Sequence, residues 1–285
     1  MIELIKDLRD RTGAGMMDCK KALEATNSDV DKAIDWLREK GIAKAQAKSS
    51  RIAAEGLAGV MVEGDKAVIL EVNCETDFVA KGEKFQALVN DSAKETLAKG
   101  YKTIEEAKTG CAQLYTDATV SMGEKLDYRR FEIVAKAAGN GFGSYIHMGG
   151  KIATLVVLEK DDAELAKGLA MHIAANAPKY VCESDIPADV IAHEKAIALE
   201  NMKNDPKMAG KPEGMLNGIA DGKVKKLLSE SVLGAQVYLL DGEKTVAQVL
   251  KEKGNNVVKF VRYSVGEGIE KRKDDFAAEV MSQVK

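Results

Sequence analysis

The segment Asn73–Val79 (NCETDFV) brings a thiol, two carboxylates, a hydroxyl and an aromatic ring into seven residues. It follows a predicted strand and precedes a predicted helix, and side chains that react or bind partners often stand on such connections. In one interpretation, Thr76 or Asp77 caps the helix and Phe78 packs into the core as a hydrophobic staple. In the other, Phe78 projects from a tight turn as an apolar wedge beside a carboxylate. Periodicity alone favours the first interpretation.

The three histidines offer little for acid–base catalysis. His172 lies in an apolar helical stretch, where a hydrogen-bonded structural histidine is the favoured interpretation. His193 falls in a polar helical segment and is expected to be solvated. His147 ends a predicted strand beside a Gly-Gly turn, and the sequence leaves open whether it contacts a partner or supports the scaffold. Neither a Gly-x-Ser-x-Gly nor a His-Glu-x-x-His motif is present, so we expect no catalytic group.

Glycine clusters and cysteines also lack the spacing of known cofactor sites. The clusters at 13–15, 139–143 and 265–268 are predicted turns, because none has the sequence context of a phosphate-binding loop. We therefore expect neither a nucleotide site nor a cofactor. No Cys-x-x-Cys pair occurs, which argues against structural zinc and a disulfide framework. The four cysteines, interpreted as small buried or surface thiols, are Cys19, Cys74, Cys111 and Cys182.

Composition narrows the class of protein. The 285 residues include 42 basic and 45 acidic side chains, giving a formal net charge of −3. This balance argues against a general nucleic-acid-binding protein, which usually presents a strongly basic face. No apolar run approaches the roughly 20 residues of a membrane span, and the first residues resemble neither a signal nor a transit peptide. We expect a cytoplasmic protein of about two domains that acts without nucleic acid or membrane.

Residues 1–41 predict three short helices. An apolar stripe at helical spacing opens the chain, and a second helix is predicted over residues 16–25. Ser28 is placed to cap a third helix, which Gly41 is expected to end. The following stretch has few large apolar side chains and predicts a partly helical linker, so that 1–54 forms one domain with its linker.

Two segments each predict a β-hairpin followed by a helix. In the first, β-prone runs at 59–62 and 66–72 flank a glycine-containing turn. In the second, runs at 143–148 and 151–158 flank a Gly-Gly turn, and a helix follows at about 163–177. Because the second run of one hairpin resembles that of the other, we predict a duplicated α+β core with antiparallel sheets.

The halves of this core are expected over 55–140 and over 141–182 together with 231–266. The intervening residues 183–230 are polar and helical, with a central break, and predict two antiparallel helices that project as a hairpin. Residues 267–285 predict a charged C-terminal helix. The sequence thus predicts an α+β protein with a three-helix N-terminal domain and an inserted helical hairpin.

Two long signatures resemble those of the translation elongation factor Ts family. They are Arg11–Leu23 (RTGAGMMDCKKAL) and Glu71–Ala80 (EVNCETDFVA), and the segments 171–175 and 265–271 are similar as well. These matches span almost the whole chain in the family's order. The resemblance implies a guanine-nucleotide exchange factor for elongation factor Tu that is not an enzyme. It also implies an N-terminal domain similar to ubiquitin-associated (UBA) domains, a two-part core, an inserted hairpin and a C-terminal helix.

The resemblance also implies which residues bind the partner. Thr76–Val79 would be the loop that enters the GTPase near its Mg²⁺ site, with Phe78 as a wedge and Asp77 disturbing the Mg²⁺ environment. His147, in the stretch SYIH, matches a core residue near the same contact surface. The loop residues are Thr76, Asp77, Phe78 and Val79, and the N-terminal candidates are Arg11, Thr12, Gly13, Met16 and Asp18.

Two questions stay open at this point. The stretch 236–241 departs from the family pattern, which often has Pro-Phe nearby, so the contacts of the predicted strand Val237–Leu240 are unassigned. No residue of the helical hairpin is assigned either, whether to exchange or to docking. The alternative function is a non-catalytic adaptor or chaperone-like protein, which would bind its partner without changing nucleotide release.

Overall fold

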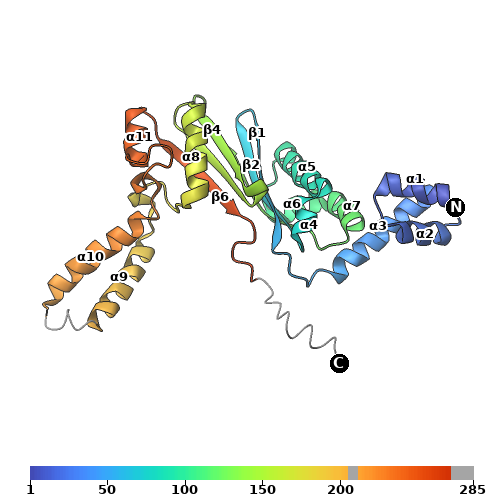
Figure 1. Cartoon of the computed structure of the whole chain (residues 1–285), viewed down its shortest axis with the longest axis horizontal. Coiled ribbons are helices and arrows are strands. Elements are labelled where there is room, and N and C mark those ends of the chain that lie inside the picture. The colour runs from blue at the N-terminus through green and yellow to red at the C-terminus, as the bar shows by residue number, and fades with distance from the viewer. Residues whose placement is uncertain (205–210, 271–285) are drawn as a thin grey trace. The chain divides into compact units, whose positions relative to one another are not determined.

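The computed structural model describes residues 1–204 and 211–270, and it contains two antiparallel three-stranded sheets with helices packed against them (Figure 1). This arrangement confirms the predicted α+β class. The chain divides into two compact units, each built from segments that are separated in the sequence. The first unit is Met1–Ala135, Ile146–Ala153 and the chain from Tyr263, and the second is Lys136–Tyr145 and Thr154–Arg262.

Three helices open the first unit: α1 (Ile2–Thr12), α2 (Met16–Ala25) and α3 (Val30–Ala47). The predicted three-helix arrangement is confirmed, and α2 has the predicted bounds. The helices enclose a small core of their own, consistent with a UBA-like domain. Its buried residues are Leu8, Ala14, Cys19, Ala22, Leu23, Ala33 and Leu37.

The N-terminal cap of α3 differs from the prediction. Ser28 has a left-handed φ of 65° and lies outside the helix, whereas Asp29 immediately precedes it. The Asp29 Oδ1 atom accepts a hydrogen bond from Lys32 N at 3.1 Å, which is the contact an N-cap residue makes. The prediction that Ser28 caps this helix is therefore wrong by one residue, because the left-handed turn delays the helix start.

The prediction that Gly41 ends α3 is also wrong, since the helix continues to Ala47. Gly41 lies where α3 packs against α7 (Ala112–Met122). A Cβ atom at this position would lie 2.5 Å from Val120 Cγ2 and 3.3 Å from Thr116 Cγ2. A glycine ends many helices by taking a left-handed conformation, but here its missing side chain lets two helices approach.

The first sheet has the order β1–β2–β3, from β1 (Glu55–Glu63), β2 (Lys66–Cys74) and β3 (Asp127–Ala135), all antiparallel. The predicted first hairpin is confirmed: Glu63 pairs with Lys66, and Gly64 makes the turn with a φ of 61°. Strand β3 was not anticipated, because two arginines interrupt its apolar alternation.

Helices α4 (Asp77–Lys81), α5 (Glu83–Lys99), α6 (Ile104–Gly110) and α7 complete the first unit. Helix α5 packs against β1 and β2, so one face of the sheet is closed by a long helix (Figure 1). The buried side chains at this contact include Val68, Leu70, Val72, Phe85, Leu88 and Val89. Their burial from water supplies the main stabilisation of this half of the protein.

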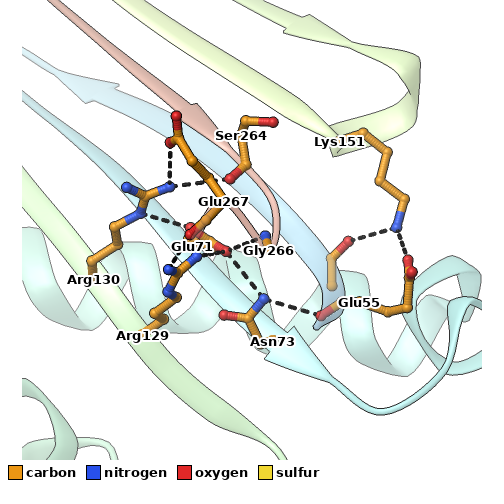
Figure 2. Close-up of polar contacts among 10 residues, drawn as sticks. Glu55, Glu71, Asn73, Arg129, Arg130, Lys151, Ser264, Gly266 and Glu267 are labelled. Carbon is orange, nitrogen blue, oxygen red and sulfur yellow. Dashed lines mark hydrogen bonds and ion pairs between the residues drawn. The ribbon is translucent and has the colours of Figure 1, made fainter. Parts of the chain in front are cut away.

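A charged residue, Glu71, is fully buried in the central strand β2 (Figure 2). Its Oε1 atom accepts hydrogen bonds from Gly266 N at 2.8 Å, Arg129 Nη1 at 2.9 Å and Asn73 Nδ2 at 3.1 Å. Its Oε2 atom accepts one from Arg130 Nε at 2.6 Å. A buried carboxylate is tolerated when it is paired and hydrogen-bonded in this way.

A β-bulge explains how two consecutive arginines reach one carboxylate. Neighbouring residues of a regular strand point to opposite faces. In the pairing of β2 with β3, however, Glu71 lies opposite Arg130 and Val72 lies opposite Tyr128, so Arg129 is an extra residue. The bulge re-aims the Arg129 side chain, and both guanidinium groups then point to Glu71.

The same arginines hold the segment that follows β6 (Val257–Ser264). Arg130 Nη2 donates to Ser264 O at 3.1 Å and to Glu267 Oε2 at 3.3 Å. Its guanidinium also lies 4.2 Å from the ring centroid of Tyr263, a cation–π contact. Together with the amide of Gly266, these contacts attach a segment almost 200 positions away in sequence to the β2–β3 pair.

The second sheet has the order β4–β5–β6, from β4 (Gly141–His147), β5 (Ile152–Leu158) and β6. A 3₁₀ turn, Met148–Gly150, joins β4 to β5, which confirms the second predicted hairpin. Helices α8 (Ala163–Asn176) and α11 (Val246–Glu252) share a core with this sheet. The predicted helix at 163–177 is thereby confirmed, and the hairpin-then-helix pattern occurs twice.

The helical hairpin predicted in the second unit is present as α9 (Ala188–Lys203) and α10 (Glu213–Ser229), which pack side by side (Figure 1). Lys195 Nζ and Asp221 Oδ1 form an ion pair across them at 2.6 Å. The predicted break lies mostly at 205–210, outside the described residues. The predicted C-terminal helix falls largely on 271–285, which are also outside them.

The extended strand predicted at Val237–Leu240 is not formed. Only an isolated bridge from Val237 to Thr245 is present, and the chain then turns. Tyr238 N donates to Lys244 O at 2.8 Å, and Gly242 N donates to Tyr238 O at 2.9 Å. Leu239 and Leu240 therefore lie within a turn and not in a strand, and Gly242, with a left-handed φ of 82°, closes that turn.

Replacing Gly143 by alanine should destabilise the second unit. A Cβ atom there would lie 2.4 Å from both the carbonyl carbon and oxygen of Ala166 in α8, and backbone cannot yield cheaply. We expect the free energy of unfolding in urea, followed by circular dichroism, to fall by about 1–3 kcal/mol. The control Gly218→Ala, at an exposed helical position with no atom within 4 Å, should instead stabilise α10 by about 1 kcal/mol. Equal stability of the two variants would contradict this packing.

Replacing Glu71 by glutamine should destabilise the first unit in a pH-dependent way. Burial alone would raise the pKa of Glu71, but hydrogen bonds from Gly266 and Arg129 and the charge of Arg130 more than offset it, so the pKa is lowered. A lowered pKa contributes stability above the ordinary value of 4.5 that is lost as pH falls through the native value. At pH 7 we expect Glu71→Gln to lower the free energy of unfolding by about 3 kcal/mol.

Urea unfolding measured from neutral to acidic pH tests the sign. The difference in free energy of unfolding between wild type and Glu71→Gln should be largest at neutral pH and shrink as the pH falls below 4.5. In this range the Glu71 carboxylate takes up a proton, whereas glutamine cannot. Glu105→Gln, which alters an exposed carboxylate in the first turn of α6, is the control and should leave stability nearly unchanged. A difference that stays constant with pH would rule out the ionised pairing.

Candidate partner-binding site

The short helix α4 carries the candidate loop residues. Thr76 is its N-cap, and the Thr76 hydroxyl oxygen accepts a hydrogen bond from Val79 N at 3.3 Å. Ala80 is buried and Val79 packs against the core of the first unit, whereas Phe78 is 83% exposed. The capping part of the first interpretation is therefore correct for Thr76, but Phe78 is not a staple. It projects from the unit as an unsupported aromatic ring.

Two charged side chains, Asp77 and Lys81, lie on the same short helix as Phe78. Asp77 Oδ2 and Lys81 Nζ form an ion pair at 2.6 Å across one turn of α4. The hydrogen bond from Lys81 lowers the pKa of Asp77, and the charge of Lys151 lowers it further. Asp77 is therefore a carboxylate at neutral pH, next to an exposed apolar side chain.

The cysteine at the base of the loop is structural. Cys74 is buried, and its thiol donates a hydrogen bond to Thr76 O at 3.1 Å. Burial raises the pKa of Cys74 to about 12. Since the thiolate is the nucleophilic form, this thiol supports the loop and is not suited to covalent chemistry.

His147 lies at the end of β4 and is half-buried. The turn after it contains Met148, which is 70% exposed and has a left-handed φ of 49°. Gly150 packs against β1, where an added Cβ atom would lie 2.8 Å from Leu57 Cδ2. The turn that carries His147 is thus fixed to the first sheet.

An ion pair also secures this turn. Lys151 Nζ lies 2.6 Å from Glu55 Oε2 (Figure 2). Strand β1 packs against both this turn and helix α4, so the two candidate segments lie along the same strand of the first unit. The structure thereby associates two candidate segments that are about 70 positions apart in the sequence.

The N-terminal candidates separate into two groups. Met16 is 60% exposed at the start of α2, and Arg11 is an exposed side chain paired with Asp7 at 3.1 Å. Asp18 is half-buried on α2. These three, like the remaining two, stay candidates for contact with a partner.

Thr12 and Gly13, the other two N-terminal candidates, also make contacts within the first unit. Gly13 ends α1 with a left-handed φ of 66°. An added Cβ atom there would lie 2.7 Å from Lys84 Nζ and 2.9 Å from Ser121 Oγ. Thr12 Oγ1 donates to Leu8 O at 2.6 Å. The two residues line an open cleft of about 710 Å³ between the three-helix domain, α5 and α7.

Sequence reasoning did not single out two exposed methionines. Met17 is 62% exposed beside Met16, and Met148 stands beside His147. Exposed methionine is an adaptable contact residue at protein surfaces. Two features of the sequence could have indicated these residues: the adjacent pair Met16 and Met17 in the N-terminal signature, and the apolar Met148 within a glycine-rich turn.

The described residues hold no cluster of side chains suited to a metal ion, since no group of three His, Cys, Asp or Glu side chains in this part of the chain is placed to bind one. His172 is fully buried, lies 2.9 Å from Gln236 Oε1 through Nε2, and accepts from Leu239 N through Nδ1 at 3.1 Å. Burial lowers the pKa of His172, which agrees with the structural interpretation. Within the described ranges, every helix is too short or too polar to span a bilayer.

Comparison with known proteins assigns the family. The family model described as elongation factor TS matches residues 75–267. A protein named elongation factor Ts from Acholeplasma laidlawii (strain PG-8A) is 47% identical, over 99% of this chain and 97% of that relative. The protein of the same name from Lactiplantibacillus plantarum is 46% identical over the same shares. The chain therefore belongs to the elongation factor Ts family of translation elongation factors.

Proposed function

We propose that this protein is a guanine-nucleotide exchange factor that binds elongation factor Tu in its GDP form and promotes GDP release, so that GTP can bind. The protein would act by binding alone, in the cytoplasm, without a cofactor, a nucleotide site of its own, nucleic acid or a membrane. Family membership supports this function. The observation that carries it is Phe78, an aromatic side chain exposed on a helix whose other face is buried.

The target of such a wedge is the site that holds GDP. A GTPase binds the phosphates through backbone amides and a lysine of its phosphate-binding loop, and through Mg²⁺. Mg²⁺ requires near-ideal octahedral geometry, so a displacement of about 1 Å among neighbouring groups weakens its binding. Phe78 would displace these groups, and the Asp77 carboxylate beside it would disturb the field at the cation.

The free energy needed to accelerate GDP release exceeds what the burial of one side chain supplies. Accelerating GDP release by about 10⁴-fold requires roughly 5.5 kcal/mol, whereas burying one phenylalanine contributes about 1.5–3 kcal/mol. The remainder must come from further contacts that favour the nucleotide-free partner. By linkage, nucleotide weakens binding of the factor as much as the factor weakens binding of nucleotide. The candidates for these contacts within the first unit are His147 and Met148 together with the N-terminal residues Arg11, Thr12, Gly13, Met16 and Asp18.

The free protein already holds the wedge in place. The N-cap at Thr76 and the Asp77–Lys81 pair stabilise α4 without burying Phe78. Ala80 and Val79 anchor the opposite side of the helix in the core. Because the helix is ordered before binding, little conformational entropy is lost when Phe78 enters a partner.

Replacing Phe78 by alanine should slow exchange much more than it destabilises the fold, because the side chain is exposed in the free protein. We expect the rate of GDP release at a saturating concentration of the factor to fall about 10- to 100-fold, the equivalent of its burial free energy. Stopped-flow fluorescence of a GDP analogue bound to elongation factor Tu measures this rate.

Val62→Ala is the matched control, since Val62 is another exposed apolar residue of the first unit, at the end of β1. It should exchange like wild type. Wild-type rates from Phe78→Ala would remove the wedge assignment. Binding of the wild-type protein without faster GDP release would instead favour the adaptor or chaperone-like function.

A further inference from the structure

The connection between α7 and β3 (residues 123–126) touches the loop that carries Phe78. Glu124 Oε2 accepts hydrogen bonds from Glu75 N and Thr76 N, both at 3.0 Å, and Glu124 Oε1 accepts one from the Thr76 hydroxyl at 2.6 Å. One half-buried carboxylate thus satisfies three donors just before α4. Hydrogen bonds to an ionised acceptor are shorter and stronger than neutral ones, so this contact defines the loop entrance.

The Thr76 hydroxyl connects Glu124 to the helix cap. A hydroxyl has one hydrogen to donate and lone pairs to accept with. Because Thr76 donates its hydrogen to Glu124, its lone pairs are directed to Val79 N, the cap contact of α4. The position of the Glu124 carboxylate therefore sets the orientation of the residue from which the Phe78 helix begins.

In a second set of contacts, the connection 123–126 donates hydrogen bonds instead of accepting them. Lys125 N donates to Glu75 Oε1 at 2.6 Å, and Arg51 Nη1 donates to Glu75 Oε2 at 3.1 Å. Lys125 Nζ donates to Ser49 O at 2.7 Å and to Arg51 O at 2.8 Å. The same connection therefore holds both the Phe78 loop and the segment that leaves the three-helix domain.

Burial alone does not fix the direction of α4. Ala80 and Val79 anchor the helix in the core, but five residues make little more than one turn, which can still pivot about that anchor. The polar contacts act at the other end, before Thr76. An isolated surface ion pair would contribute little, whereas a carboxylate held by two backbone amides and a hydroxyl constrains both distance and direction.

We infer that Glu124 is a positioning residue for exchange: it fixes the direction in which α4 presents Phe78, and its neighbour Lys125 ties the same point to the segment 48–51. This inference rests on the proposed exchange function. It assigns to Glu124 no contact with the partner. Its effect passes through Thr76, so it should alter the rate of GDP release within the complex more than the affinity for elongation factor Tu.

Two substitutions separate geometry from charge. Glu124→Asp keeps the charge but withdraws the carboxylate by one methylene. We expect the saturating rate of GDP release to fall about 10-fold or more, as for a misplaced reacting group, with the half-saturating concentration nearly unchanged. Glu124→Gln removes the charge but keeps the shape: its oxygen can accept from both amides, and its NH₂ can donate to the Thr76 hydroxyl. It should retain most of the activity. Glu105→Ala, which removes an exposed carboxylate, should behave as wild type.

Hydrogen exchange of the Thr76 amide in the free protein is an independent readout. Glu124→Asp should lose protection there, while its unfolding midpoint in urea stays close to wild type. The inference is overturned if Glu124→Asp releases GDP as fast as wild type, if only the half-saturating concentration changes, or if Glu124→Gln is the more defective variant. If the wild type itself fails to accelerate GDP release, the proposed function fails, and the amide protection still decides whether Glu124 holds the loop.

Discussion

The first unit depends on one buried interaction, the Glu71 carboxylate with its four hydrogen-bond donors (Figure 2). It joins β2, the bulged strand β3 and the segment after β6, which hydrophobic packing alone would not fix in register. Removing one member of such a group leaves an uncompensated buried charge, which is why these contacts act together. Removing the Glu71 carboxylate and its two arginine partners from water is unfavourable, but their pairing specifies one arrangement of three distant segments.

This rigid base allows the rest of the unit to expose groups that a stable core would normally bury. Phe78 stands outside on α4, while the neighbouring turn exposes Met148 in a left-handed conformation that disfavours a side chain. Such features persist only where surrounding contacts hold them. Here the sheet and the ion pair of Lys151 with Glu55 hold the turn, and the Thr76 cap holds the helix.

The proposed exchange function requires no reactive group. Exchange depends on the difference between the affinities for the nucleotide-free and the GDP-bound partner. The decisive property is therefore the position of apolar and charged groups before the partner binds. The described side chains agree with that requirement: the buried thiol of Cys74 and the buried imidazole of His172 are used as hydrogen-bonding scaffold, whereas the exposed positions carry the candidate contacts. Because burying one phenylalanine supplies only about 1.5–3 kcal/mol, the proposed function calls for an extended set of contacts.

The sequence by itself determined the elements whose signals are local: the helix at 16–25, both hairpins and the helical pair α9–α10 follow from periodicity and turn residues. The two signatures at 11–23 and 71–80 also predicted the family, which the comparison with known proteins shows. Only the tertiary structure decided the register of β3, the passage of α3 through Gly41 and the turn at Val237–Leu240. It alone revealed the contact of Glu124 with Thr76, 48 positions apart. These features arise from bulges, close approach and pairing between distant segments, which no local pattern encodes.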